Sequence, residues 1–214
     1  MTYLNILSDR EILTIYERID IAKQYEPRYY GMIHALNTVE YAKKLAVCFE
    51  LTEKETELLL DACVLHNIGH LNGKNLHAQT GCEMAKTYLK KNNFEQRDIN
   101  IISSAIANHM GRSADDFYNS VPACLILADK MDFGETRYKP YFEYTSEEDD
   151  VLRSVTYIDV NRVGDTVFLI VGGKNVNWNK FVRTSDYAKT YACFEKVCKK
   201  RNLKFSFRKK DLSK

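Results

Sequence analysis

The chain has 214 residues, 45% of them hydrophobic, with a formal net charge of +2. This length predicts one domain of ordinary size, or one domain with a small appendage. The near-neutral charge argues against nucleic acid as a partner, and the lack of a long apolar run or a signal peptide argues against a membrane. We therefore expect a cytoplasmic protein. Its six scattered cysteines form no Cys-x-x-Cys pair and are expected to be free thiols in the core.

A helical pattern covers most of residues 1–140, which we predict to form one helical domain. Ser8–Glu11 and Thr52–Glu55 both have the Ser/Thr-x-x-Glu spacing of a capping box, which marks the start of a helix. Apolar periodicity predicts helices over residues 34–50, 55–66, 77–92, 95–109 and 120–132. The 55–66 segment is apolar on nearly every side, as expected of a helix in the middle of a bundle. The predicted fold class is therefore mainly α.

The character of the sequence changes after Pro140. The acidic segment Thr145–Asp150 has the composition of a turn-like connector, and Gly164-Asp165 has that of a hairpin turn. The predicted elements are strands over about 151–161, 165–172 and 203–208 and a helix over about 185–201. Residues 141–214 are thus predicted to form a small α+β extension. It could cover the mouth of an active site, or its edge strands could form a homodimer.

All five histidines occur in one ordered series that ends at an acidic residue: His34, His66, His70, His77, His109 and then Asp129. Histidine is the commonest neutral metal ligand. His109 follows Ile106, and Asp129 follows Leu125, at helical spacings, so both are predicted to face the core. A buried carboxylate is costly unless it is paired or bound to a metal, and the series therefore indicates a metal site.

Each of these residues has a simpler interpretation when it is taken alone. A single buried histidine is more often a hydrogen-bonded core residue than a ligand. Asp129 could pair with Lys130 or Arg137 instead of a cation. His70 is the weakest candidate, because Gly69 is expected to interrupt the helix before it. The joint pattern favours a metal site, since four inward histidines and an inward aspartate would otherwise need separate explanations.

The series resembles the HD-domain superfamily of metal-dependent phosphohydrolases, which is named for a His-Asp doublet and has the order of His34, His66-Asn67 and Asp129. Ala62–His70 resembles the apolar helix of that family, which ends in His-Asp-Ile-Gly, and Leu127–Asp132 resembles its closing aspartate segment. The resemblance covers roughly residues 28–137 and implies an HD-type helical bundle.

His77 and His109 resemble the two additional ligands of the two-metal branch of this family. The Gly-Tyr-Pro signature of the branch that degrades cyclic di-GMP is absent after His109, so that substrate is disfavoured. The implied metal ligands are His34, His66 and Asp129 for one cation, His77 and His109 for a second, and Asn67 as the bridge between them. Either one or two ions are expected, and the ligand set does not distinguish Fe, Mn, Co, Ni, Zn or Mg.

Candidate catalytic residues, which would contact phosphate or protonate the leaving oxygen, are Asn67, His70, Arg112 and Lys130. Candidate substrate-binding residues are Arg28, Tyr29 and Lys130. Arg28-Tyr29-Tyr30 could pair a phosphate and stack a base, although the same aromatic residues could instead pack the N-terminal helix. Lys130 could equally be an ordinary surface lysine.

Asn67 departs from the family pattern, because asparagine offers one neutral oxygen where aspartate offers two anionic ones. We expect weaker metal occupancy and a large loss of turnover. The other five ligand positions are intact, which is more typical of a substitution that traps substrate than of natural decay. Two functions are predicted side by side. One is a metal-dependent phosphohydrolase acting on a phosphate ester or anhydride, preferably a nucleotide. The other is a catalytically inactive regulatory module that binds a nucleotide or metal.

Overall fold

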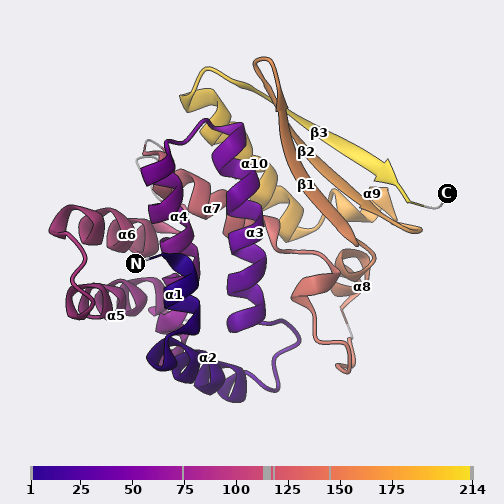
Figure 1. Cartoon of the computed structure of the whole chain (residues 1–214). Helices are drawn as coiled ribbons and strands as arrows, with labels where there is room; N and C mark the ends of the chain where they lie inside the picture. Colours follow the sequence, from indigo (N-terminus) through magenta and orange to yellow (C-terminus); the bar gives the residue numbers. More distant parts are fainter. Residues whose placement is uncertain (1, 74, 113–116, 118, 145, 213–214) are drawn as a thin grey trace.

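The computed structural model describes every residue of the chain except 1, 74, 113–116, 118, 145 and 213–214. Helices form the larger part of the molecule, and a three-stranded sheet with α10 lies beside them (Figure 1). The helices are α1 (Tyr3–Ser8), α2 (Arg10–Ala22), α3 (Met32–Cys48), α4 (Glu53–Leu65), the 3-10 helix η1 (Ile68–Asn72), α5 (His77–Lys91), α6 (Gln96–Asn108), α7 (Ser120–Met131), the 3-10 helix η3 (Glu135–Arg137), α8 (Glu147–Arg153), α9 (Trp178–Phe181) and α10 (Ser185–Lys200). The strands are β1 (Tyr157–Val163), β2 (Thr166–Gly173) and β3 (Lys204–Asp211). The fold is mainly α with a small α+β part at the C-terminal end, as predicted.

The central helices lie where apolar periodicity predicts them. α3 to α7 agree with the five predicted segments to within two residues at either end. The capping box of α4 is confirmed, since Glu55 N donates to Thr52 Oγ1 at 3.2 Å and Thr52 N donates to the Glu55 carboxylate at 2.9 Å. Every residue of α4 from Leu58 to Leu65 is buried, and the helix contacts α1, α3, α6 and α7. It therefore occupies the middle of the bundle.

The predicted helix start at Ser8 is wrong. Ser8 is the last residue of α1, and its hydroxyl donates to the carbonyls of Leu4 and Asn5. The cap of α2 is Asp9, whose carboxylate accepts from Glu11 N at 2.8 Å. Because the serine hydroxyl is bonded to its own preceding turn, the neighbouring carboxylate caps the next helix.

Helix α8 replaces most of the predicted acidic connector and the first part of a predicted strand. Thr145 lies outside the described residues, but Ser146 caps α8 by accepting from Asp149 N at 3.3 Å. Four acidic residues then occupy the first turn, at the positive end of the helix dipole. An acidic run that suggests a turn is therefore also a good helix start. β1 accordingly begins at Tyr157 and not near residue 151.

The sheet is built from the predicted hairpin and a crossover. β1 and β2 are antiparallel, and Gly164, in the turn between them, has a φ of 60°. β2 also pairs in parallel with β3, so β1 and β3 are the edge strands. A parallel neighbour requires a crossover, which α9 and α10 supply. The homodimer expected from the edge strands stays a prediction, as does the division of the chain at residue 140.

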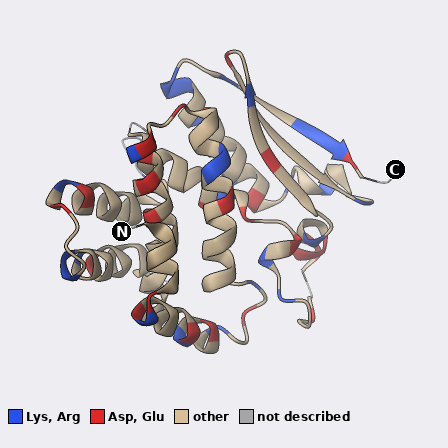
Figure 2. Cartoon of the chain, viewed as in Figure 1, with Lys and Arg blue, Asp and Glu red and all other residues tan. Residues whose placement is uncertain are grey.

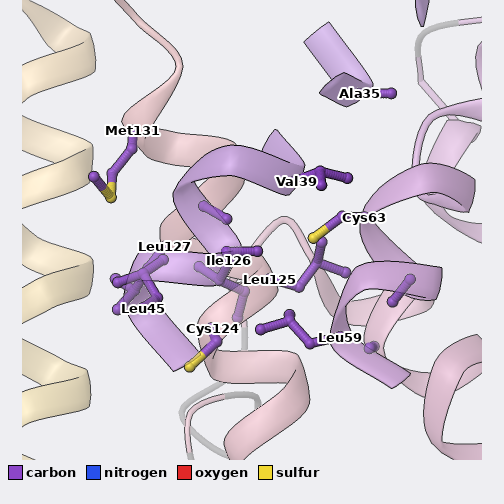
Figure 3. Close-up of a cluster of buried hydrophobic side chains, with 14 of the residues drawn as sticks. Ala35, Val39, Leu45, Leu59, Cys63, Cys124, Leu125, Ile126, Leu127 and Met131 are labelled. Carbon is purple, nitrogen blue, oxygen red and sulfur yellow. The ribbon is translucent and has the colours of Figure 1, made fainter. Parts of the chain in front are cut away.

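The core lies where α3, α4 and α7 meet. Figure 3 shows buried side chains from these helices, of which the labelled ones are Ala35, Val39, Leu45, Leu59, Cys63, Cys124, Leu125, Ile126, Leu127 and Met131. Each is at most 1% exposed, and full burial of one large apolar side chain stabilises a fold by roughly 1.5–3 kcal/mol. Because α3 and α4 are consecutive helices packed together, the start of α3 lies near the end of α4.

The composition of the surface agrees with the small net charge. Acidic and basic residues are mixed over the helices in Figure 2, whereas β3 is mainly basic, with exposed residues Lys204, Arg208, Lys209 and Lys210. The six cysteines are buried and free, as predicted. Within the described residues, no helix combines the length and apolar character needed to cross a bilayer.

Candidate metal centre

Three helix ends bring together His34, His66 and Asp129. His34 lies in the first turn of α3, His66 directly follows α4, and Asp129 lies in the last turn of α7. His34 Nε2 lies 3.2 Å from His66 Nε2 and 3.1 Å from Asp129 Oδ1, and the possible ligand atoms all lie within 4.8 Å of one another. Both imidazoles are buried, and the Asp129 side chain is 13% exposed. The predicted convergence of distant residues at one point is confirmed.

The hydrogen bonds of the two rings define which nitrogens carry protons. His66 Nδ1 donates to the Cys63 carbonyl at 2.8 Å, and His34 Nδ1 lies 2.6 Å from Asp132 Oδ2, to which it donates when Asp132 is ionised. In a neutral imidazole the other nitrogen is then an acceptor. With Asp132 ionised and the proton of His34 on Nδ1, two lone pairs and a carboxylate oxygen of Asp129 face one another. A divalent cation would satisfy all three acceptors, and two imidazoles with one carboxylate form a suitable ligand set.

The charge states of the site support this arrangement. Burial lowers the pKa of His66 to about 3 and that of His109 to about 4, so both rings are neutral at ordinary pH. Burial alone would raise the pKa of Asp129, but the adjacent Lys130 ammonium holds it below its usual value. Lys130 Nζ donates to Asp129 Oδ2 at 2.6 Å. Of the two pairings considered for Asp129, the one with Lys130 is therefore present, while Arg137 pairs with Asp132 at 3.2 Å.

His77 and His109 form a second pair next to the first group. His109 Nδ1 donates to the Ile106 carbonyl at 2.6 Å, and His109 Nε2 lies 3.0 Å from His77 Nε2. The rings of His66 and His109 are 5.3 Å apart between centroids, in an edge-on arrangement. Within the described part of the chain, the group whose ligand atoms lie within 4.8 Å of one another does not include this pair. The structure thus shows one compact three-residue group and an adjoining histidine pair.

His70 lies next to the His77 and His109 pair, because Gly69 lets η1 approach α5 closely. Gly69 does not interrupt the helix, because α4 already ends at Leu65 and Gly69 lies inside η1 together with His70. η1 packs so closely on α5 that a Cβ at Gly69 would lie 2.0 Å from the His77 carbonyl oxygen. His70 consequently stacks on His77, with ring centroids 4.1 Å apart. Burial, with His77 alongside, lowers the pKa of His70 to about 3. Among the described residues, nothing forms a hydrogen bond with its buried Nδ1.

Asn67 lies directly beside the three-residue group. Its side chain is almost fully buried, and Nδ2 donates to the Tyr30 carbonyl at 3.3 Å. An aspartate has no hydrogen to donate to that carbonyl at neutral pH. The surroundings therefore provide a partner that suits the amide found at this position.

A cavity of about 490 Å³ opens onto Asn67, Asp129 and the three histidines His70, His77 and His109, whereas His34 and His66 are not part of its described lining. Its lining consists of Arg28, Tyr30, Asn67, His70, Asn75, His77, His109, Met110, Arg112, Asp129, Lys130, Asp132, Arg137 and Asp186. The predicted residues Arg28, Arg112 and Lys130 are thus brought to one cavity. Tyr29 is not part of its described lining, and Tyr30 takes that place. Residues 23–31, between α2 and α3, belong to no helix or strand, so periodicity could not indicate which of the two tyrosines faces inward.

Apart from Tyr30, five lining residues were not among the predicted site residues: Asn75, Met110 and the three charged residues Asp132, Arg137 and Asp186. Asp132 follows Asp129 by three residues, and that helical spacing was a usable signal. Arg137 was considered only as a partner of Asp129, yet it pairs with Asp132. Asp186 comes from α10, far along the chain, and no sequence pattern connects it to the histidines.

The chain is similar to known proteins over its helical part. The family model for the HD domain matches residues 31–160, more than half of the chain. Among solved structures, a "predicted HD superfamily hydrolase" from an uncultured Thermotogales bacterium is similar, with 22% sequence identity and a TM-score of 0.46, over 61% of this chain and 78% of that one. No curated protein matches the chain. The family match contains the whole series from His34 to Asp129, whereas Arg28 and Asp186 lie outside it.

Proposed function

This chain belongs to the HD domain family, and from that premise we propose that it is a metal-dependent phosphohydrolase acting on a nucleotide. The observation that carries the proposal is the meeting of His34 Nε2, His66 Nε2 and an Asp129 oxygen, with possible ligand atoms of the three residues all within 4.8 Å of one another. A divalent cation held there polarises phosphate oxygens and activates water. His77 and His109 are the proposed ligands of a second ion, and the two ring nitrogens that face each other at 3.0 Å support that role.

The cationic residues of the cavity are the proposed phosphate contacts. The Asp129 carboxylate outweighs the effect of burial on Lys130 and raises the pKa of its ammonium group, so Lys130 stays charged and can donate to a phosphate oxygen. Arg112 is exposed at the cavity and offers a planar pair of donors for the same purpose. His70 is largely neutral and would bind or orient the phosphate more readily than it would supply a proton.

A second function is favoured by one specific observation. The Asn67 amide removes a negative charge from the centre of the site, and its hydrogen bond with the Tyr30 carbonyl gives the amide a structural place there. A regulatory module that binds a nucleotide without turnover would have no need of the missing carboxylate. The phosphohydrolase is preferred because the remaining proposed ligands are all present in the cavity or beside it.

The two functions can be separated by comparing the protein with its Asn67→Asp variant. Metal content would be measured first. Phosphate release would then be assayed with nucleoside mono-, di- and triphosphates, dinucleoside polyphosphates and cyclic nucleotides, with Mn²⁺, Co²⁺, Ni²⁺, Zn²⁺, Mg²⁺ or Fe²⁺. Asp129→Asn is the control that removes a proposed ligand. The phosphohydrolase predicts release that rises in Asn67→Asp and disappears in Asp129→Asn. Binding without product, even in Asn67→Asp, would establish the regulatory module instead.

A further inference from the structure

Asp186 is the carboxylate that the C-terminal part of the chain contributes to the cavity. It lies in the first turn of α10 and lines the cavity together with Asp129, Lys130 and Arg137. The family match ends at residue 160, and the proposed metal ligands leave Asp186 without a role. Its side chain is 25% exposed, so one side of the carboxylate is open to the cavity.

The three carboxylates of the cavity differ in how their oxygens are used. Both oxygens of Asp129 and both oxygens of Asp132 lie within hydrogen-bonding distance of neighbouring side chains. Asp186 accepts from Arg28 Nη1 at 3.0 Å through Oδ2 alone. Within the described part of the chain, no hydrogen-bond donor reaches its Oδ1. Asp186 therefore has an anionic oxygen available for a ligand.

The position of Asp186 is fixed from two sides. Arg28 bridges it to Asp149 of α8, at 3.0 Å and 3.1 Å respectively. The Thr190 hydroxyl lies 2.7 Å from the Lys130 carbonyl and 2.8 Å from the Asp186 carbonyl, and so it ties the first turn of α10 to the end of α7. Lys130 and Asp186 are therefore held close together in the lining of the same cavity.

Most of the remaining residues of the lining are polar or charged. Met110 is its one aliphatic side chain among the described residues. The Tyr30 ring is already approached by Arg137, at 5.1 Å from the ring centroid, by Lys23, at 5.6 Å, and by the His70 ring, at 5.2 Å. A sugar, which carries hydroxyls, suits this polar lining better than a flat nucleobase does.

We propose that Asp186 accepts hydrogen bonds from the sugar hydroxyls of the substrate, so that the cavity selects phosphate esters of ribose over esters that lack these hydroxyls. The inference rests on the proposed phosphohydrolase function and adds which part of the substrate is recognised. The phosphate lies toward Lys130 and the histidines, and the sugar lies toward α10. Hydrogen bonds to an ionised carboxylate are stronger than those between neutral groups. A ligand without sugar hydroxyls would leave the open oxygen of Asp186 without a hydrogen bond, which adds to the selectivity.

Calorimetric binding with Mn²⁺ present tests this without relying on turnover. The probes are adenosine 5′-monophosphate, its 2′,3′-dideoxy analogue, ribose 5-phosphate and inorganic phosphate. The variants are Asp186→Ala and, as the matched control, Asp149→Ala, which removes the other carboxylate bound to Arg28 but does not line the cavity. We expect the unchanged protein to bind the ribonucleotide about tenfold or more tightly than the dideoxy analogue. Ribose 5-phosphate should likewise bind more tightly than inorganic phosphate.

The variants decide between sugar recognition and a structural role. Asp186→Ala should bring the ratio between ribonucleotide and dideoxy analogue close to one, while Asp149→Ala keeps it. Equal ratios in both variants, or equal affinity of the unchanged protein for the two nucleotides, would overturn the inference and leave the phosphohydrolase proposal standing. Failure of every probe to bind, inorganic phosphate included, would instead overturn the proposed function and this inference with it.

Discussion

Replacing Asp132 with asparagine should weaken the binding of a divalent cation. His34 Nδ1 lies 2.6 Å from Asp132 Oδ2, and the ionised Asp132 carboxylate, by accepting from it, would direct the lone pair of His34 Nε2 toward Asp129. An amide at this position can accept only through its single oxygen, and turning its NH₂ group toward the ring would favour the opposite tautomer of His34. In either case the imidazole is less well prepared to bind a cation.

The size of the effect follows from two of the contacts that Asp132 makes, those with His34 and Arg137. Loss of a carboxylate that orients a metal-binding histidine costs roughly 10- to 100-fold in metal affinity, which corresponds to about 1.4–2.7 kcal/mol. Asp132 also pairs with the nearly buried Arg137 at 3.2 Å. Leaving that guanidinium without its partner should lower the free energy of unfolding by about 3 kcal/mol.

Calorimetric titration with Mn²⁺ at fixed pH measures the affinity, and urea unfolding followed by circular dichroism measures the stability. Arg137→Gln is the matched control, because it breaks the same ion pair but leaves the contact between His34 and Asp132 intact. We expect both variants to lose stability and only Asp132→Asn to lose Mn²⁺ affinity. Equal loss of affinity in the two variants, or unchanged affinity in Asp132→Asn, would refute the orienting role of Asp132.

Three further predictions concern packing, pH and metal. Gly69→Ala should lower the free energy of unfolding by about 1–3 kcal/mol or more, because the added Cβ would lie 2.0 Å from the His77 carbonyl oxygen. In the control Gly81→Ala, the nearest atoms to the added Cβ lie at 3.3 Å. Urea unfolding should therefore show a much smaller loss of stability in Gly81→Ala. Burial raises the pKa of Asp61 to about 7, whereas in the unfolded chain this carboxyl has its ordinary pKa of 3.8. Between these two pH values the native state keeps a proton that the unfolded chain has lost. Stability should therefore fall between about pH 4 and pH 7, and Asp61→Asn should be more stable than the unchanged protein above pH 7, by up to about 4 kcal/mol, with no such gain below pH 4; parallel urea titrations at pH 4 and pH 8 that show equal differences would contradict this. Mn²⁺ at 100 times its dissociation constant should raise the free energy of unfolding by about 2.7 kcal/mol, and either a chelator or Asp129→Asn should abolish that increase.

The meeting of the histidines could be predicted because it depends on helix faces. His109 and Asp129 continue apolar stripes, and His66 ends a helix that is apolar all round, so each had to point inward. Periodicity gives the face of a residue on its own helix but not its partner on another. Pairings such as Arg137 with Asp132, and the approach of Asp186 from α10, depend on how the helices and the sheet pack. These features therefore required the three-dimensional structure.

Local capping competition explains the errors at element starts. Ser8 and Asp9 are neighbouring cap residues, and the sequence alone does not show that the serine hydroxyl is engaged by the preceding turn. Ser146 likewise starts a helix in a segment whose acidic composition also suits a turn. In both places two local structures have similar intrinsic preference, and packing of the flanking residues selects one of them.

The exchange of Asn67 for aspartate should have opposite effects on stability with and without metal. Asn67 is almost fully buried, and its amide donates to the Tyr30 carbonyl at 3.3 Å. A carboxylate would lose that bond and face the carbonyl oxygen unpaired, at a cost of about 1–3 kcal/mol. A divalent cation at His34, His66 and Asp129 would attract the added charge and offset the loss. Asn67→Asp should thus be less stable than the unchanged protein in a chelator and gain more from Mn²⁺.

Urea unfolding of both proteins with chelator and with Mn²⁺ measures this difference directly. Asn75→Asp is the matched control, since it adds the same charge to an exposed position in the lining of the same cavity. It should leave stability in chelator nearly unchanged, because no buried hydrogen bond is lost. Equal stability of Asn67→Asp and the unchanged protein in chelator would show that the Tyr30 contact contributes nothing. An equal gain in stability from Mn²⁺ in Asn67→Asp and in the unchanged protein would show that residue 67 does not interact with the cation. There would then be no physical reason to expect a carboxylate at this position to restore turnover.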